Sequence, residues 1–443
     1  MAGSPSSEYV STELQRVAEK ARDMPATALT TLAHHISVLV LHEAYLRTRK
    51  SGAVGVDGQT AEQYEAGLRE NLKSLLNRFK SGTYQAPPVR RVHIPKGDGQ
   101  TRPIGIPTYE DKILQRAVAM VLGAVYEQEF CECSYGFRPG RSAHQALEVL
   151  WKKLMDMGGG IVVDVDVQAF FDSMDHAMLR EFLDRRVRDG VLRRAVDKWL
   201  SAGVLEEGIV IHPETGAPQG GVISPLLANV YLHEVLDRWF EETVKPQMEG
   251  EAFLVRYADD VVMVFASPRD AQRVMKVLAA RFAKYKLTVH PSKTRVVDFG
   301  RPRLNHRGKK EASFAFLGFT HYWGRSRKGA WVVKRKTESK RISRAAKAVA
   351  EWCRKNRHRP LAEQHQKLGR KIQGHCAYYG ITGNSQLLER FRDLVVKVWH
   401  KWLNRRGQRK GTAWEWLTRF LRRHPLPKPI AMHSVLRGRA ASP

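Results

Sequence analysis

The sequence predicts an α+β fold in which a segment of mixed helices and strands precedes a strongly basic, all-α C-terminal segment. Short runs of β-branched and aromatic residues at 161–167, 253–257 and 261–265 have the length and composition of strands. Apolar residues at helical spacing in 61–81, and again after residue 334, predict amphipathic helices. A chain of 443 residues exceeds what one hydrophobic core usually supports, so we expect two or three domains.

The charge balance predicts a polyanionic partner. Lys and Arg number 74 against 45 Asp and Glu, a formal net charge of +29 that repels itself unless a polyanion shares it. Nucleic acid is the natural partner, and a membrane surface is the alternative. No stretch approaches the ~20 apolar residues of a spanning helix, so we expect no membrane partner. The polar first eight residues lack an apolar run, which favours a cytoplasmic location over export.

The N-terminal part is expected to be helical. Residues 1–10 are expected to be disordered, and helical spacing in 11–49 is broken near Pro25. The glycine-rich turn at 51–58 is either a phosphate cradle or a plain loop. In the helix expected at 61–81, one stripe predicts core packing: Leu68, Leu72, Leu75, Leu76 and Phe79.

A basic two-stranded flap is predicted at 89–108. A Gly-Asp-Gly turn separates two strand-like runs, and Lys96 and Arg102 flank this turn. Lys supplies a point charge and Arg a bidentate fork, so together they suit a triphosphate. The alternative is a solvated basic hairpin.

Paired carboxylates are the clearest chemical signal. Alternation in 163–167 places Asp164 and Asp166 on one strand face, and Tyr257-Ala-Asp-Asp260 predicts a hairpin turn that carries Asp259 and Asp260. Adjacent carboxylates repel each other unless a cation relieves them, and hard oxygen ligands suit Mg²⁺. One acid from each segment would complete a two-metal site for nucleotidyl transfer, whereas an isolated Asp-Asp turn would simply be solvated.

These blocks carry a resemblance to a known family. The hairpin, the Asp166 strand followed by Phe170-Phe171-Asp172, and the block at 218–232 resemble the motifs of reverse transcriptases. The segment Ser-Tyr-Gly-Phe-Arg-Pro-Gly-Arg-Ser at 134–142 is typical of the narrower group of group II intron-encoded reverse transcriptase/maturases.

The resemblance implies a right-hand polymerase. We expect a helical N-terminal extension at 1–60, fingers and palm with an antiparallel sheet at 61–328, and an all-α basic thumb/maturase domain at 329–425. Residues 426–443 would form a C-terminal tail. The sequence that follows the thumb holds no zinc-bound His-Asn-His nuclease, as in the compact class C group, so we expect no cleavage of the target strand.

The resemblance also implies roles for residues at the catalytic centre. Asp166, Asp259 and Asp260 would be the catalytic ligands of two Mg²⁺ ions, with Mn²⁺ as a substitute. Phe171 would close over the sugar of the incoming deoxynucleotide; the alternatives are a core Phe, or a register shifted by one to Phe170. The remaining dNTP contacts would be Lys96, Arg102 and Gln219.

Contacts to primer and template are implied for a further set of residues. Arg138 and Arg141 would touch template backbone, with plain solvent exposure as the alternative. Lys293 and Gly318 would lie at the primer, although Gly318 reads equally well as an ordinary strand glycine.

The motif Ser224-Pro225 predicts a helix start with Ser224 as N-cap. The expected buried stripe of this helix is Leu227, Val230, Tyr231 and Val235.

The basic C-terminal helices would bind intron RNA. Their outward face would include Lys397, Lys401, Arg405 and Arg406. The interleaved residues Trp399, Trp402, Trp414 and Trp416 either stack on bases or, as their spacing favours, pack in the core.

The implied activity is RNA-directed DNA polymerisation from dNTPs on an RNA template with a DNA primer. The chain would also act as a maturase in a ribonucleoprotein with group II intron RNA, assisting splicing and retrohoming into a DNA target. Two alternatives stay open: a domesticated relative in DNA repair or phage defence, and an RNA-binding splicing factor without polymerase activity. The intact carboxylates count against the second.

Overall fold

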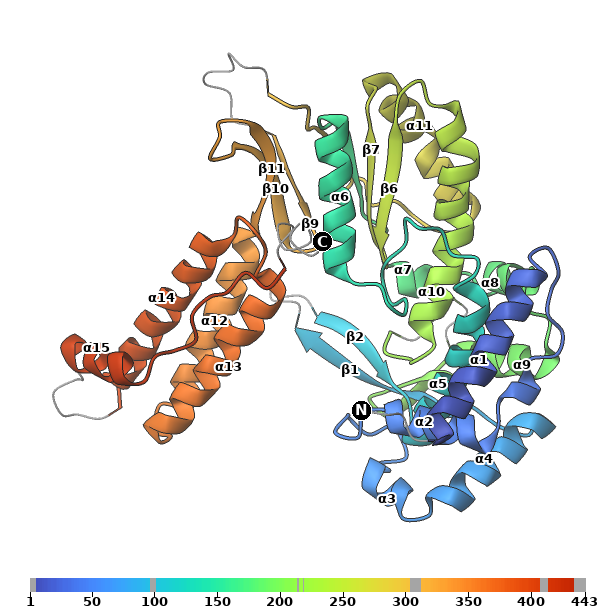
Figure 1. Cartoon of the computed structure of the whole chain (residues 1–443). Coiled ribbons are helices and arrows are strands. Elements are labelled where there is room, and N and C mark those ends of the chain that lie inside the picture. The colour runs from blue at the N-terminus through green and yellow to red at the C-terminus, as the bar shows by residue number, and fades with distance from the viewer. Residues whose placement is uncertain are drawn as a thin grey trace. The chain divides into compact units, whose positions relative to one another are not determined.

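The computed structural model describes residues 5–95, 101–212, 215–217, 219–302, 312–406 and 413–433 (Figure 1). The chain divides into two compact units, one made of Met1–Ala143 and Val163–Arg295, the other of His144–Val162 and Val296–Pro443. In the described ranges no helix is both long and apolar enough to cross a membrane.

Helices form the N-terminal part of the first unit, as the periodicity predicts, but the disorder expected for residues 1–10 is wrong for residues 5–10, which begin α1. They are α1 (Pro5–Asp23), the 3-10 turn η1 (Ala33–His35), α2 (Val38–Arg47), α3 (Ala61–Glu65), α4 (Leu68–Ser81) and α5 (Tyr109–Tyr126). A capping box formed by Thr60 and Gln63 begins α3 and satisfies its first amides. Of the stripe expected at 61–81, Leu72, Leu75 and Phe79 are buried.

The predicted flap is half of a larger sheet. β1 (Val89–Pro95) and β2 (Thr101–Ile106) pair antiparallel from Arg90↔Ile106 to Pro95↔Thr101, which confirms the two strands. The sheet has the order β2-β1-β4-β5, because β4 (Val204–Glu206) pairs parallel with β1 and antiparallel with β5 (Ile209–Ile211). The turn at 96–100, and with it Lys96, lies outside the described residues.

The carboxylate hairpin forms as predicted. β6 (Ala252–Tyr257) and β7 (Asp260–Phe265) pair antiparallel from Ala252↔Phe265 to Tyr257↔Asp260, and β3 (Ile161–Val165) is the next strand after β7 (Figure 1). All but the turn-proximal residues of both hairpin strands are buried, because helices pack around this sheet. Of the helices of the first unit, α11 (Pro268–Lys284) contacts β7. The unit also contains α7 (Phe170–Ser173), α8 (His176–Asp184) and α9 (Gly190–Ser201).

The helix predicted after Ser224 is present, but its capping prediction is wrong. α10 (Ser224–Leu232) starts at Ser224 itself, and the residue before it, Ile223, makes no side-chain cap. The helical path continues through η2 (His233–Asp237), η3 (Trp239–Val244) and η4 (Lys245–Gln247). The predicted stripe, Leu227, Val230, Tyr231 and Val235, is buried.

The second unit contains α6 (Ala143–Met157) and a three-stranded antiparallel sheet of order β11-β10-β9. Its strands are β9 (Ser313–Phe316), β10 (Phe319–Arg325) and β11 (Trp331–Thr337), and β8 (Arg295–Asp298) lies at the unit boundary in sequence. The single strand expected through 314–319 is wrong, because Leu317 and Gly318 have φ of +48° and +79° and form a hairpin turn. The indole of Trp151 in α6 donates to the carbonyl of Val333 at 2.8 Å, which ties α6 to β11.

Four helices complete the second unit: α12 (Ser339–Lys355), α13 (Leu361–Tyr379), α14 (Ser385–Leu403) and α15 (Trp414–Arg423). The all-α character expected for 329–425 is wrong at its start, because β11 pairs with β10 there. Their shared core includes Leu368, Ile372, Phe391 and Trp399. Trp399 is fully buried and its indole donates to Gln364 at 2.9 Å, so the core role is confirmed for this residue. Trp414 and Trp416 are 45% and 41% exposed, so their stacking on bases stays a prediction.

Candidate active site

The hairpin turn that carries the acidic pair has a constrained backbone. Ala258 and Asp259 are its two turn residues, and Asp260 opens β7 opposite Tyr257. Ala258 has φ +56°, a conformation that L residues adopt at a cost in free energy. Gly136 lies directly against this turn, since a Cβ on it would be 2.2 Å from the amide nitrogen of Ala258. The segment around Gly136 therefore packs on the turn at backbone distance.

A buried arginine fixes the base of the same turn. Arg256 is fully buried, and its guanidinium forms a bidentate pair with Asp237, with Nε–Oδ1 2.8 Å and Nη2–Oδ2 2.5 Å. It also donates to Asn229 Oδ1 at 2.8 Å, Ser134 Oγ at 2.8 Å and the carbonyl of Ala258 at 3.1 Å. Because the last acceptor is the turn itself, this network sets the position of the residue before Asp259.

The loop at 131–141 is held by the same network. The Asn229 amide donates to the carbonyl of Gly136 at 2.7 Å, and the Tyr135 amide donates to the carbonyl of Arg256 at 2.9 Å. Arg138, the expected template contact, is 6% exposed; it pairs with Glu127 at 3.0 Å and donates to the carbonyl of Ser134 at 2.9 Å. Its guanidinium thus holds the loop in this structure.

Arg141, the second expected template contact, is half-buried. It pairs with Glu132 at 2.7 Å and lies over the ring of Tyr135. Its ion partner is largely exposed, so this pair contributes little stability.

Asp166 immediately follows β3, the strand next to β7 in the sheet. Its carbonyl accepts from the amide of His290 at 2.8 Å. The ammonium of Lys293 lies 3.8 Å from Asp166 Oδ1, so the residue expected at the primer contacts a predicted metal ligand here. Both side chains are about half exposed, and such a pair is worth at most ~1 kcal/mol.

The three acids offer the hard oxygen donors that Mg²⁺ prefers. Asp166 and Asp259 are partly exposed and Asp260 is exposed, so an ion from solvent can reach them, and the weak Lys293 pair presents little barrier to exchange. Within the described ranges no three His, Cys, Asp or Glu side chains converge closely enough to hold one metal ion. The oxygen donors of the three acids therefore fit a divalent ion.

A cavity of about 320 Å³ lies beside the first sheet. Its polar lining comes from β1, β2 and the segments near 172 and 215–219: Arg91, Gly105, Asp172, Thr215, Gly216 and Gln219. The carbonyl of Gln219 accepts from the amide of Gly105 at 2.6 Å. Gly220, with φ +112°, would place a Cβ 2.5 Å from the carbonyl oxygen of Gly105, so only glycine permits this approach. The structure therefore places the predicted nucleotide contact Gln219 on a cavity wall.

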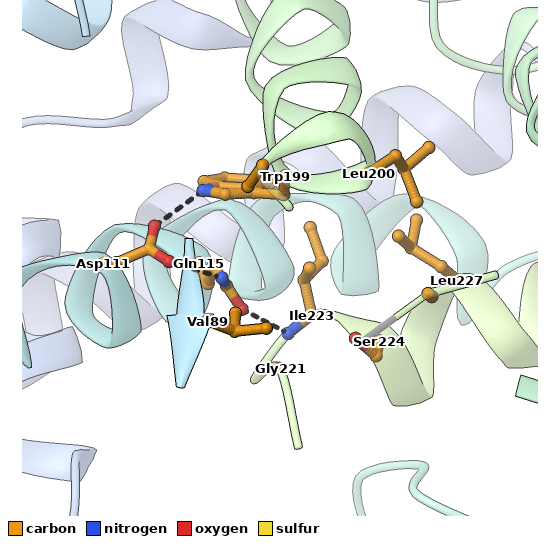
Figure 2. A pocket seen from close by; sticks show the side chains of 11 residues that line it. Val89, Asp111, Gln115, Trp199, Leu200, Gly221, Ile223, Ser224 and Leu227 are labelled. Atoms are coloured by element: carbon orange, nitrogen blue, oxygen red, sulfur yellow. Dashed lines mark hydrogen bonds between the residues drawn. The ribbon is translucent and has the colours of Figure 1, made fainter. Parts of the chain in front are cut away.

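Gln115, Asp111 and Trp199 form a buried polar chain beside Ile223, a few residues after Gln219 (Figure 2). Gln115 Oε1 accepts from the amides of Val222 at 2.7 Å and Ile223 at 3.3 Å, the two residues that precede α10. Gln115 in turn donates to Asp111, whose carboxylate also accepts from the indole of Trp199 at 2.7 Å. Burial raises the pKa of Asp111 to about 6, although these hydrogen bonds oppose the shift.

The two adjacent phenylalanines differ in their surroundings. Phe170 is buried and meets Tyr231 edge-on at 6.3 Å, which is core packing. Phe171 is half-buried, its carbonyl accepts from the amide of Ala217 at 2.8 Å, and the next residue, Asp172, lines the cavity. Phe170 is therefore a core residue, whereas Phe171 is packed less completely.

The other predicted contacts lie at the surface or in the second unit. Arg102 is exposed on β2 opposite Ile94. The nearest atom to a Cβ on Gly318 would be Tyr379 Oη at 3.1 Å. The four predicted RNA-binding residues, Lys397, Lys401, Arg405 and Arg406, are all exposed.

Sequence reasoning missed the residues that position the site. Arg256, Asp237, Asn229 and Gln115 are buried polar groups within helices and strands. The available signal was Arg256 itself, a charge inside an apolar strand and two residues before the turn.

The sequence is similar to those of several known proteins. The family model described as reverse transcriptase (RNA-dependent DNA polymerase) matches residues 94–321. Protein YkfC of Escherichia coli is 32% identical over 314 residues, which cover 64% of this chain and 80% of YkfC. Group II intron-encoded protein LtrA of Lactococcus lactis is 33% identical over 227 residues, covering 50% of this chain and 37% of LtrA. Nuclear intron maturase 2, mitochondrial, of Arabidopsis thaliana is 31% identical over 175 residues, covering 24% of that protein.

Proposed function

This chain belongs to the reverse transcriptase (RNA-dependent DNA polymerase) family, and we propose that it copies RNA into DNA with Asp166, Asp259 and Asp260 as its catalytic carboxylates. The observation that carries the proposal is the hairpin turn. Its acidic pair stands on a strained turn that a buried guanidinium and a closely packed loop hold in place. Rigid placement of this kind is what positioning of reacting groups requires.

Two Mg²⁺ ions would be held by these three carboxylates and would supply activation of the primer hydroxyl and neutralisation of charge on the phosphates. Lys293, whose ammonium lies 3.8 Å from Asp166 Oδ1, would contact the primer. The Arg256 network orients the turn before Asp259. Mn²⁺, which also accepts oxygen ligands, would substitute.

The cavity beside the first sheet would take the incoming deoxynucleotide. Gln219 lies on its wall, and Phe171 precedes the lining residue Asp172, where its ring would exclude a 2′-hydroxyl. Arg102 on β2 and Lys96, beyond the described residues, would bind the triphosphate.

The right-hand architecture is part of the same proposal. Residues 61–328 would form fingers and palm, 329–425 the thumb/maturase domain, with 1–60 as a helical extension and 426–443 as a tail. The exposed basic residues of α14 and its following turn would bind RNA through phosphates.

The maturase role rests on relatives whose names place them with introns. The chain matches about a third of LtrA's length, so intron RNA binding, splicing and retrohoming into a DNA target are proposed separately from polymerisation. A cytoplasmic ribonucleoprotein would be the working form.

Asp259→Asn tests the catalytic assignment in single-turnover extension of a DNA primer on an RNA template. Extension should be abolished while RNA affinity is unchanged or slightly higher, because a negative charge at the nucleic acid has been removed. The matched control is Asp197→Asn, which removes the carboxylate of a surface pair with Arg180 and should extend like wild type. Extension by Asp259→Asn within tenfold of wild type would overturn the assignment.

A further inference from the structure

Phe137 is an exposed aromatic residue in a buried loop. Its side chain is 60% exposed, whereas Ser134, Tyr135 and Arg138 are 0%, 5% and 6% exposed. Gly136, immediately before it, is buried against the hairpin turn. One large apolar ring is therefore displayed from a segment that is otherwise packed.

The backbone of Phe137 is also strained. Its φ is +59°, in the left-handed region where bulky L residues are outliers. The residues on both sides are fixed by buried hydrogen bonds: the carbonyl of Gly136 accepts from Asn229, and Arg138 binds the loop carbonyls. The surrounding structure thus enforces a conformation that the residue itself disfavours, a pattern that clusters at binding sites and active sites.

The displayed ring lies beside the catalytic turn. The centroids of Phe137 and Tyr257 are 6.5 Å apart, and Tyr257 is the last residue of β6, two positions before Asp259. Two aromatic rings therefore stand next to the acidic pair. Scattered exposed apolar residues are ordinary, but this one combines exposure, strain and a fixed position at the turn.

We propose that Phe137, with Tyr257 beside it, is a binding residue for a nucleobase at the growing end of the primer. The inference rests on the proposed polymerase function, because the primer terminus must reach the carboxylates of the turn during extension. Bases stack on aromatic side chains without sequence preference, and a polymerase needs such tolerance at the primer end. The template base opposite is the alternative contact, and the experiment separates the two.

The test compares Phe137→Ala, Phe137→Gly and Phe137→Trp. Primer–template affinity is measured by fluorescence anisotropy, and single-turnover extension is followed at saturating primer–template. Phe137→Ala should weaken affinity by about 10- to 100-fold, the loss expected for one stacked base, while the saturated rate changes little. Phe137→Trp should restore affinity. Phe137→Gly relieves the positive φ and should unfold no earlier than wild type, yet bind as weakly as Phe137→Ala.

An abasic scan identifies the contacted strand. Abasic nucleotides at the last three primer positions, and at the paired template positions, are tested with wild type and Phe137→Ala. A primer position that weakens wild type but not Phe137→Ala supports the proposal, and coupling only at a template position overturns it. The control Ile209→Ala removes an equally exposed apolar side chain from β5 and should leave affinity unchanged.

The two levels of inference fail differently. If wild type extends primers and Phe137→Ala binds primer–template as tightly as wild type, the role of Phe137 is refuted and the polymerase function stands. If wild type does not extend primers at all, the proposed polymerase function is refuted, and so is the binding of a primer base by Phe137.

Discussion

The Arg256–Asp237 pair offers the sharpest prediction, because both side chains are 0% exposed. Asp237→Asn leaves a buried guanidinium without its counter-charge, and removal of one partner of a buried pair typically lowers the free energy of unfolding by about 3–5 kcal/mol. Arg256 also donates to Asn229, Ser134 and the turn carbonyl, so the pair affects the position of the turn as well as the stability of the fold.

Arg256→Lys separates folding from turn placement. A lysine keeps the charge for Asp237 but cannot fork to the carbonyl of Ala258, so the turn before Asp259 loses its tether. A displacement of about 1 Å at reacting groups lowers rates by about 100-fold, so the single-turnover rate should fall 10- to 100-fold with primer–template affinity unchanged. Urea unfolding at the assay temperature confirms that the variant is folded.

The matched control is Arg281→Lys. Arg281 is a part-buried arginine that donates to the carbonyls of Val235 and Glu234. It should lose stability without losing rate. The reasoning is refuted if Asp237→Asn lowers the unfolding free energy by less than about 1 kcal/mol, or if Arg256→Lys extends as fast as Arg281→Lys.

Three further predictions follow from other parts of the chain. Burial lowers the pKa of His321 from 6.5 to about 3. Between these pH values the imidazole is protonated in the unfolded chain and neutral in the folded chain. Stability should therefore rise with pH between about 3 and 6.5 by ~1.4 kcal/mol per unit from this group. The difference in unfolding free energy between wild type and His321→Phe, measured in urea, should change with pH over this range and be constant above about pH 6.5. Phe171→Val should raise the use of ribonucleotides relative to deoxynucleotides by about 10- to 100-fold, and an unchanged ratio of kcat/KM values would assign Phe171 to packing. Neutralising Lys397, Lys401, Arg405 and Arg406 together should weaken intron RNA binding and flatten its log K against log salt slope by about 0.7–0.9 per lost phosphate contact, with single-nucleotide addition retained. An equal fall in both assays would favour a repair or defence polymerase over a maturase.

Local patterns in the sequence predicted the local structure. The two strands around Asp259 and Asp260 and the buried stripe of α10 follow from periodicity, which depends on neighbours along one element. The single helix predicted at 61–81 is helical but is divided into α3 and α4 at Ala66–Gly67. The pairing of β1 with β4 joins Val89 to Val204 and was not predictable, because nothing local encodes a partner so distant in sequence. The Gly318 turn was missed because its flanking strands have the same composition as one continuous strand.

In the candidate site too, residues in local motifs were predictable and their distant partners were not. The acids were predicted as site residues because their chemistry stands out in short motifs, and Gln219 because its block resembles one of the family. The groups that hold them were not, since Gln115 accepts from the amide of Val222, 107 residues away, and Asp237 reaches Arg256 from a neighbouring helix. Arg138 illustrates the limit: an arginine in a turn-rich loop suggests solvent or nucleic acid, yet tertiary packing buries it on Glu127.

The most direct test of polymerisation is a primer-extension measurement with the purified wild-type chain. A DNA primer is annealed to an RNA template and supplied with dNTPs across a Mg²⁺ titration, with Asp166→Asn measured in parallel. The account predicts a full-length, alkali-resistant product that requires Mg²⁺ and is absent with Asp166→Asn. Extension that proceeds without a divalent ion, or an Asp166→Asn rate within tenfold of wild type, would contradict it.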